Sequence, residues 1–310
     1  MKNFFSRFFP ELCAAVVAGV ILYFAQAHLA AGNSTDKAEE FFQLGNEQMD
    51  AKNFAAAIDN YTEAIRINPK YTDAYRNRAD IYYQQKNYEA AETDFTRAVR
   101  LGLHDATVYY NRGECNLALK NYQQAVDDFT QAVSLGFNDV SVYSSRGVAC
   151  YWLKNYEQVV TDFDAAIALG LNDAVAYTFR GMADYHLKNY EQTIRDFDEA
   201  VSRGRTDDYL LYKYRADSKF YLENYAAALD DYDKAIALNP DFSMLYNNRG
   251  LTYASLNRYD EALADYNRAI ELDENNPLAY GNRAEIYLRL GDNQQAADDL
   301  AKAKALSLSQ

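Results

Sequence analysis

The sequence predicts an all-α chain in which pairs of helices are repeated in tandem. Three observations lead to this fold class. Only 4 of the 310 residues are proline, so few positions break a helix. From residue 38 onward, one pattern of small and aromatic residues returns about every 34 residues. Within each copy, the patterned residues lie three or four positions apart, which places them on one face of a helix.

Residues 1–31 differ from the rest of the chain. Lys2 and Arg7 flank an aromatic stretch, and an apolar run follows over 12–25. Three interpretations are open. Residues 12–31 could span a bilayer as an uncleaved anchor, the segment could be a secretory signal, or it could be a buried core helix. Residues 25–27, Ala-Gln-Ala, would be the cleavage site of a signal.

In the anchor and signal interpretations, the basic residues stay on the cytoplasmic side of the membrane. We therefore expect either a membrane-anchored protein with its repeats on the extracytoplasmic side, or a periplasmic or secreted protein if the leader is cleaved. Residues 32–37, GNSTDK, are expected to form a short polar linker.

The clearest mark of the repeat is a small residue on the first helix of each copy. These residues are Gly45, Ala79, Gly113, Gly147, Gly181, Ala216, Gly250 and Ala284. Four residues earlier stands an aromatic residue in every copy, at Phe41, Tyr75, Tyr109, Tyr143, Tyr177, Tyr212, Tyr246 and Tyr280. Small residues let two helices approach closely, and aromatic rings fill the gaps between them. The spacing defines eight units, at about 38–71, 72–105, 106–139, 140–173, 174–208, 209–242, 243–276 and 277–310.

Each unit also carries turn and stop signals. The turn sequence Lys-Asn-Tyr recurs four times between the two helices, for example at 86–88. Repeats end in Asn-Pro, at 68–69 and 239–240, or in Leu-Gly, with glycines at 102, 136 and 170. Proline cannot continue a helix, and glycine readily adopts the left-handed conformation of a helix cap.

The period and the order of residue types resemble the tetratricopeptide repeat (TPR) over residues 38–310. One representative set is Tyr75, Ala79, Tyr82, Ala91, Phe95 and Ala98. The resemblance implies a right-handed superhelix, an α-solenoid of eight helix pairs. It also implies a concave groove lined by the first helix of each pair.

An arginine and an aspartate recur 16 residues apart in repeats 2–8. The pairs are Arg78 with Asp94, Arg112 with Asp128, Arg146 with Asp162, Arg180 with Asp196, Arg215 with Asp231, Arg249 with Asp265, and Arg283 with Asp299. Repeat 1 lacks both residues and has Leu44 and Asn60 instead. This joint loss predicts a ladder of partly buried ion pairs that join the first helix to the second. Recognition of an acidic ligand by these arginines is disfavoured, because the pairing already uses them.

By the same resemblance, the second, fifth, sixth, ninth and twelfth residues of each repeat face the groove. The candidate peptide-binding residues, with one neighbour of the twelfth position, are Arg76, Asn77, Asp80, Tyr83, Tyr110, Asn111, Glu114, Tyr151, Trp152, Tyr185, Lys213, Asp217, Phe220, Asn248 and Asn282. An acidic groove with aromatic residues at its middle suits an extended peptide with basic or apolar side chains. The four asparagines occupy the sixth position. They could hold a peptide backbone through their amides, or they could be ordinary polar groove residues.

Composition and motifs exclude several other functions. A net charge of −14 disfavours nucleic acid as a partner, because phosphate binding needs a basic surface. Cys115 and Cys150 are the two cysteines outside the leader, and they are expected to be small core residues, with a disulfide as the alternative. No phosphate-binding glycine loop, nucleophile motif or metal-ligand cluster occurs, so we expect no enzymatic activity, no cofactor and no metal.

The predicted function is therefore a non-catalytic, protein-binding scaffold or adaptor, anchored in a membrane or exported, that holds extended peptide segments. Two alternatives stay open. One is a structural assembly factor that forms homo-oligomers through its repeat ends. The other is a soluble periplasmic protein that binds a small ligand.

Overall fold

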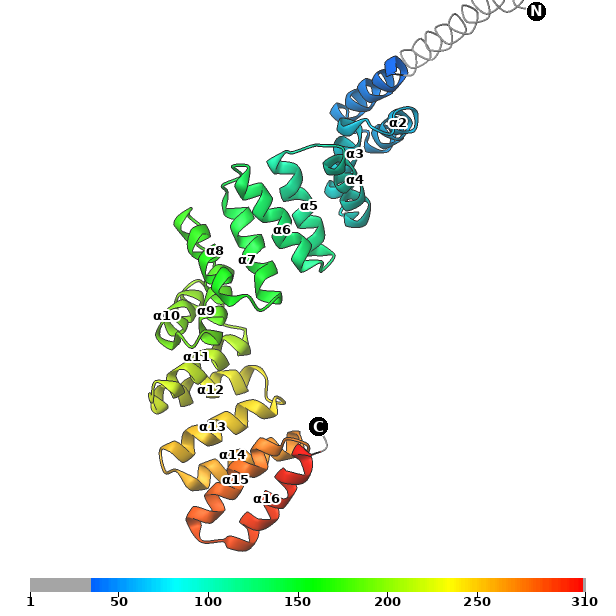
Figure 1. The fold of residues 1–310 in the computed structure, drawn as a ribbon. Helices are drawn as coiled ribbons and strands as arrows, with labels where there is room; N and C mark the ends of the chain where they lie inside the picture. Colours follow the sequence, from blue (N-terminus) through cyan, green and yellow to red (C-terminus); the bar gives the residue numbers. More distant parts are fainter. Residues whose placement is uncertain (1–34, 309–310) are drawn as a thin grey trace, which may run out of the picture. The chain divides into compact units, whose positions relative to one another are not determined.

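The computed structural model describes residues 35–308, which form helices and no strand (Figure 1). Within this range, no helix combines the length and apolarity needed to cross a membrane. The predicted leader over 1–31 lies outside the described residues. The first described helix covers 35–50. It includes residues 35–37, so the prediction of a linker over 32–37 is wrong for these three residues, which contain neither proline nor glycine to stop a helix.

The described residues divide into two compact units, 35–138 and 139–308. In the first unit, the helix over 35–50 is followed by α2 (Phe54–Ile67), α3 (Thr72–Gln84), α4 (Tyr88–Arg100), α5 (Ala106–Ala118) and α6 (Tyr122–Ser134). The second unit contains α7 (Val140–Trp152), α8 (Tyr156–Ala168), α9 (Ala174–His186), α10 (Tyr190–Ser202), α11 (Tyr209–Tyr221), α12 (Tyr225–Leu238), α13 (Ser243–Ser255), α14 (Tyr259–Leu272), α15 (Pro277–Leu290) and α16 (Asn293–Ser307). Inside each unit, every helix packs on the next one along the chain.

The small residues on the first helices allow this close packing. At Gly113, an added Cβ would lie 2.7 Å from the ring of Phe129 on the second helix, closer than van der Waals contact permits. The ring itself is fully buried, as are Ala125 and Ala132 on the same helix. Alternating small and large side chains therefore set the distance between the two helices of a pair.

The turns between paired helices have a regular backbone. In repeats 1–7, the residue that closes the turn is not glycine but has a positive φ of 56–64°, as at Lys86 and Lys188. Repeat 8 has Gly291 there, with φ 84°. The predicted left-handed glycine caps at the ends of second helices are confirmed at Gly102 and Gly136, with φ of 102° and 94°.

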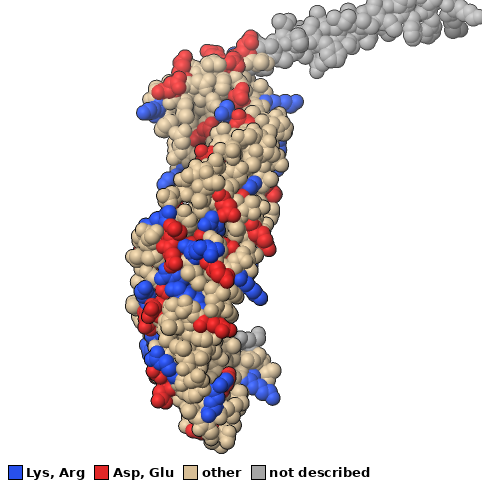
Figure 2. All heavy atoms as spheres, turned by 90° about the vertical axis from the view of Figure 1, so that its left-hand side faces the viewer, with Lys and Arg blue, Asp and Glu red and all other residues tan. Residues whose placement is uncertain are grey.

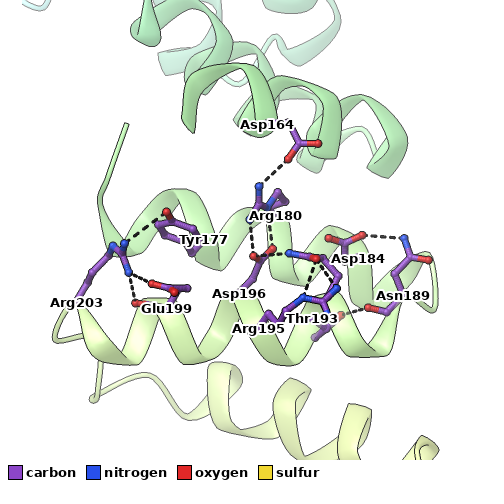
Figure 3. A network of polar contacts seen from close by, with 11 residues as sticks. Asp164, Tyr177, Arg180, Asp184, Asn189, Thr193, Arg195, Asp196, Glu199 and Arg203 are labelled. Atoms are coloured by element: carbon purple, nitrogen blue, oxygen red, sulfur yellow. Dashed lines mark hydrogen bonds and ion pairs between the residues drawn. The ribbon is translucent and has the colours of Figure 1, made fainter. Parts of the chain in front are cut away.

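Charged side chains of both signs intermingle on the face shown in Figure 2. The aspartates of the Arg–Asp pairs of repeats 2–8 are all buried. Their shortest N–O distances are 2.7 Å for Arg78–Asp94, 2.5 Å for Arg112–Asp128, 2.6 Å for Arg146–Asp162, Arg180–Asp196 and Arg215–Asp231, and 2.7 Å for Arg249–Asp265 and Arg283–Asp299. We call this set the ion-pair ladder. Figure 3 shows the repeat 5 pair, in which Arg180 donates to both oxygens of Asp196.

The ladder arginines also connect neighbouring repeats. Six of the guanidinium groups also contact the second helix of the preceding repeat: Arg78 with Thr62, Arg112 with Thr96, Arg180 with Asp164, Arg215 with Asp198, Arg249 with Asp233, and Arg283 with Asn267. In repeats 2–8, the arginine also lies 5.4–5.9 Å from the ring of the tyrosine three residues earlier. One side chain thereby joins three helices.

The balance between burial and pairing differs along the ladder. At Asp265, burial raises the pKa and the hydrogen bond from Arg249 only partly offsets it. At Asp231, burial also acts to raise the pKa, but hydrogen bonds from Arg215 and Lys219 outweigh it and the pKa is lowered. The second cation makes this carboxylate the more strongly stabilised of the two.

Candidate functional site

The first helices of successive repeats contact one another directly within each unit. The contacting pairs are α3–α5 in the first unit and α7–α9, α9–α11, α11–α13 and α13–α15 in the second. No two second helices of the described chain contact each other to this extent. The first helices therefore line the inner side of each unit, where the TPR resemblance places the groove.

The groove asparagines bond to the preceding first helix. Each donates a hydrogen bond from its Nδ2 atom to a side-chain oxygen: Asn77 to Asn46 (3.0 Å), Asn111 to Asp80 (3.2 Å), Asn248 to Asp217 (3.0 Å) and Asn282 to Asn247 (3.0 Å). One amide hydrogen of each asparagine is thus used within the chain. At Asn111 and Asn282 the second amide hydrogen and the carbonyl oxygen have no further partner among the described residues. The Asn77 amide also contacts the Tyr61 hydroxyl at 3.4 Å, and the Asn248 carbonyl accepts a hydrogen bond from Asn247 at 3.1 Å.

In the first unit, the bonded pair Asn77 and Asn46 borders a cavity of about 220 Å³. Its lining is Asn46, Met49, Asp50, Tyr61, Asn77 and Asp80. Burial raises the pKa of the Asp80 carboxyl, and the nearby Arg76, at 3.9 Å, partly offsets that effect. The carboxylate therefore contributes less free negative charge than its residue type suggests.

Two candidate tyrosines of the first unit, Tyr83 and Tyr110, contact other aromatic rings. Tyr110 stacks on Phe137, with 4.7 Å between ring centroids. Tyr83 lies 6.2 Å from Tyr88. Burial, and after it the charge of Glu114, raises the pKa of Tyr83, so the phenol stays protonated and can donate a hydrogen bond.

In the second unit, four side chains converge on Asp217. Its carboxylate accepts hydrogen bonds from Lys213 (2.7 Å), Tyr185 (3.2 Å), Tyr232 (2.5 Å) and Asn248 (3.0 Å). The residue is 4% exposed. These donors come from α9, α11, α12 and α13, so the carboxylate ties three consecutive repeats together. Its charge is balanced inside the protein, which makes this part of the groove less acidic than expected from the sequence.

A cavity of about 360 Å³ opens beside this carboxylate, and we call it the aromatic pocket. It is lined by Tyr185, Lys213, Asp217, Phe220, Tyr221, Tyr232, Phe242, Met244, Asn248 and Leu251. The structure thus brings five of the candidate groove residues together. The sequence reasoning did not name the other five. Met244 and Leu251 occupy second and ninth positions of repeat 7, so the repeat register could have found them, whereas Tyr232 lies on the second helix of repeat 6, outside the positions expected to face the groove.

The remaining candidates of the second unit lie elsewhere on the first helices. Tyr151 contacts Phe179 edge to face, with centroids 5.4 Å apart, and packs beside Trp152 at 6.0 Å. Trp152 is 57% exposed, an unusual exposure for the largest apolar side chain. Asn282 borders a small cavity of about 100 Å³ on α15.

The described residues 35–308 contain no group of three or more His, Cys, Asp or Glu side chains arranged to hold a metal ion. Cys115 and Cys150 are buried free thiols. Burial raises the pKa of Cys115 to about 12 and that of Cys150 to about 11, as expected for thiols that serve packing.

Models of the tetratricopeptide repeat match residues 42–102, 106–136, 231–264 and 278–309, and a TPR repeat model matches 250–291. The chain is a tetratricopeptide-repeat protein. No curated protein sequence matches this TPR chain. Its fold is similar to solved TPR structures, all at low sequence identity.

One of these structures is the C-terminal part of a TPR repeat-containing protein from Cytophaga hutchinsonii, with 19% identity and a TM-score of 0.58, covering 76% of this chain and 96% of that one. Another is YrrB, described as a TPR protein with an unusual peptide-binding site, with 24% identity and a TM-score of 0.52, covering 60% and 94%. A third is MamA from Desulfovibrio magneticus RS-1, with 19% identity and a TM-score of 0.52, covering 55% and 96%. At these identities the likeness establishes the TPR fold alone.

Proposed function

We propose that this TPR protein is a non-catalytic scaffold that binds extended segments of other polypeptides along its first helices. The aromatic pocket beside Asp217 is the observation that carries the proposal. The Asp217 carboxylate already accepts four hydrogen bonds from the protein, so an entering side chain displaces water from aromatic and aliphatic surface without leaving this buried charge unpaired. The peptide-binding site named for YrrB, which shares the fold, supports the same class of function.

The pocket chemistry favours a large apolar side chain as the anchor of the bound segment. Phe220, Tyr221 and Met244 supply aromatic and thioether surface around it. Its volume of about 360 Å³ lies within the range of about 300–1,000 Å³ that is usual for ligand pockets. A few buried aromatic contacts of this kind commonly supply most of the binding energy of an interface.

Polar groove residues would hold the backbone of the same segment. Of the sixth-position asparagines, Asn111 and Asn282 each keep one amide hydrogen and the carbonyl oxygen for such contacts. Asn77 keeps its carbonyl oxygen, and Asn248 keeps one amide hydrogen. A carboxamide can donate a hydrogen bond to a peptide C=O and accept one from a peptide N–H, whatever side chain the bound residue carries. The net charge of −14 favours segments that carry basic residues beside the apolar anchor.

A peptide selection tests this function. Random peptides would be selected against the full-length protein, and the enriched peptides would be measured against the wild type and a Phe220→Ala variant. We expect the variant to lose about tenfold or more in affinity, because it removes an aromatic wall of the pocket. Leu238→Ala is the matched control, since this leucine is 42% exposed on α12 and does not line the pocket.

Two results would count against the proposal. Selected peptides could bind the Phe220→Ala variant as tightly as the wild type, or they could lose the same affinity with Leu238→Ala. Thermal unfolding of each variant would show that the fold is retained in the comparison.

We further propose that residues 12–31 anchor the protein in a membrane or direct its export, with the repeats on the extracytoplasmic side. The basic residues before the apolar run support this orientation. Membrane fractionation with N-terminal sequencing of the mature protein tests it. An intact leader in the membrane fraction indicates an anchor, a mature start after Ala27 indicates a cleaved signal, and an intact leader in the cytosolic fraction contradicts both.

A second candidate function, assembly through the repeat ends, is favoured by the last helix pair. Leu288 and Leu290 on α15 are 49% and 52% exposed, and Leu300 on α16 is 48% exposed. No later helix covers them among the described residues. Light scattering of the full-length protein tests this candidate: a monomer across a wide concentration range would contradict it.

A further inference from the structure

One position of the repeat carries an acidic residue in repeat 5 and in no other repeat: the eleventh, three residues after the small marker. In repeats 2, 7 and 8 it is a tyrosine whose ring lies about 6 Å from the ladder arginine, namely Tyr82 (6.0 Å), Tyr253 (5.9 Å) and Tyr287 (5.9 Å). In repeats 3 and 6 it donates a hydrogen bond to the ladder aspartate, from Asn116 to Asp128 (3.0 Å) and from Lys219 to Asp231 (2.6 Å). In these repeats the side chain therefore either packs beside the ladder or bonds to it.

In repeat 5 this position is Asp184, which can do neither while ionised. The residue is 2% exposed, and its Oδ1 accepts a hydrogen bond from Asn189 at 2.8 Å (Figure 3). Its Oδ2 is buried and has no hydrogen-bond partner among residues 35–308. A buried acceptor without a donor is costly and uncommon in folded proteins.

The unpaired oxygen belongs to a residue that lines a cavity of about 480 Å³. The lining comes from α8, α9, α10 and the turn before α10, and consists of Val160, Asp164, Arg180, Asp184, Lys188, Asn189, Glu191, Gln192 and Arg195. None of these residues lines the aromatic pocket, whose α9 contribution is the next residue, Tyr185. Consecutive residues of a helix point in directions about 100° apart, so the two cavities open on different sides of α9.

The other polar groups of this cavity are mostly engaged. Arg180 pairs with Asp196 and with Asp164, both at 2.6 Å. Gln192 donates to Asp196 at 2.9 Å and accepts from Arg195 at 2.7 Å. Lys188 and Glu191 are exposed at the edge and contribute opposite charges. The unmet requirement inside the cavity is therefore a hydrogen-bond donor for Asp184 Oδ2.

Repeat 6 shows which donor fits beside a ladder pair. There the ammonium of Lys219 lies 2.6 Å from Asp231, while Arg215 keeps its own 2.6 Å contact with the same aspartate. An ammonium group and an intact Arg–Asp pair thus coexist at the equivalent place in this molecule. We propose that the cavity of repeat 5 binds a primary ammonium group, which donates to the carboxylate of Asp184 beside the ladder pair, as the ammonium of Lys219 donates to the carboxylate of Asp231 in repeat 6.

Two sources share this chemistry: a lysine side chain of a partner polypeptide and a free alkylamine. Burial raises the pKa of Asp184, with the neighbouring Asp196 adding to the effect. A bound ammonium would oppose this shift by stabilising the ionised carboxylate. The site does not depend on the groove, so it can exist whether or not the first helices bind peptides.

The test measures binding of Nα-acetyl-lysine methylamide to the full-length protein by NMR titration, with the Nε-acetylated derivative as the neutral probe of similar shape. We expect only the charged probe to bind. Asp184→Asn keeps the shape of the site and should weaken binding by about tenfold or more, because it removes the charged acceptor. Asp184→Tyr installs the residue type of repeats 2, 7 and 8, fills the cavity and should abolish binding while the fold is retained.

n-Butylamine distinguishes the two sources: weaker binding than the lysine derivative indicates a peptide lysine, and equal binding indicates a free amine. Leu238→Ala, at an exposed residue of α12 that lines neither cavity, should leave binding of both charged probes unchanged. The proposal is overturned if no charged probe binds, if the neutral probe binds equally well, or if Asp184→Asn binds as the wild type does.

Discussion

The ion pair between Arg78 and Asp94 can be removed by copying repeat 1, which has leucine and asparagine at the corresponding positions. Arg78 donates to both carboxylate oxygens, at 2.7 and 2.8 Å. The side chains of Arg78 and Asp94 are only 15% and 6% exposed. Arg78→Leu would leave a buried carboxylate without its cation, and we expect a loss of about 3–5 kcal/mol in the free energy of unfolding.

The double variant, Arg78→Leu with Asp94→Asn, should be less damaging than the sum of the single variants. Asp94→Asn alone leaves the guanidinium with only Thr62 and two tyrosine rings, and should cost about 1–3 kcal/mol. With both charges removed, no buried charge is left unpaired. The expected coupling energy between the two positions is about 2 kcal/mol.

Urea unfolding of the full-length chain measures the loss in the free energy of unfolding for each variant, and the coupling energy follows from these losses. Native-state hydrogen exchange at the amides of α3 and α4 accompanies it. The exchange data localise the effect, because each repeat of a solenoid is stabilised chiefly by its neighbours. If the single-variant losses add to that of the double variant within about 0.5 kcal/mol, the two residues are not coupled and the ladder does not stabilise the array.

Three further outcomes are expected. Gly113→Ala should destabilise the protein by about 1 kcal/mol or more, because its Cβ would overlap a buried ring, as read from the urea midpoint. Gly281→Ala, where a Cβ meets nothing within 4 Å, should stabilise α15 by up to about 1 kcal/mol, and equal effects at the two glycines would contradict the packing account. Because the folded-state pKa of Asp231 is lowered, the stability that it contributes should be present above its unfolded pKa of about 3.9 and be lost as the pH falls through the folded value. An Asp231→Asn variant should therefore show a weaker acid dependence in pH-titrated unfolding, and an unchanged dependence would refute this assignment. Cys115 and Cys150 should react slowly with a thiol reagent in the native protein and rapidly in urea, whereas fast native labelling would show that they are accessible.

The repeat architecture could be predicted from the sequence because every unit solves the same packing problem. A small residue such as Gly113 lies opposite a ring such as Phe129 in each helix pair, so the pattern returns at a constant interval. The partners of the ladder were predictable for a similar reason, since Arg78 and Asp94 recur at a fixed separation and are absent together in repeat 1. Residues that recur with the repeat period reflect how the two helices of one repeat pack together, and this packing is the same in every repeat.

The sites arise where the repeats differ from one another, and there the sequence was not sufficient. Asp217 accepts hydrogen bonds from residues 32 and 31 positions away, Tyr185 and Asn248. The second contact has a counterpart between Asn111 and Asp80, whereas the Tyr185 contact has no counterpart at Asp80 among the described residues. The cavity beside Asp184 likewise contains an acidic residue at a position that is not acidic in any other repeat. Such contacts depend on how three neighbouring repeats stack, and stacking is set by all the side chains between them rather than by the repeat period. The sequence determined the array and its ladder, while the tertiary structure decided where that array leaves room for a guest.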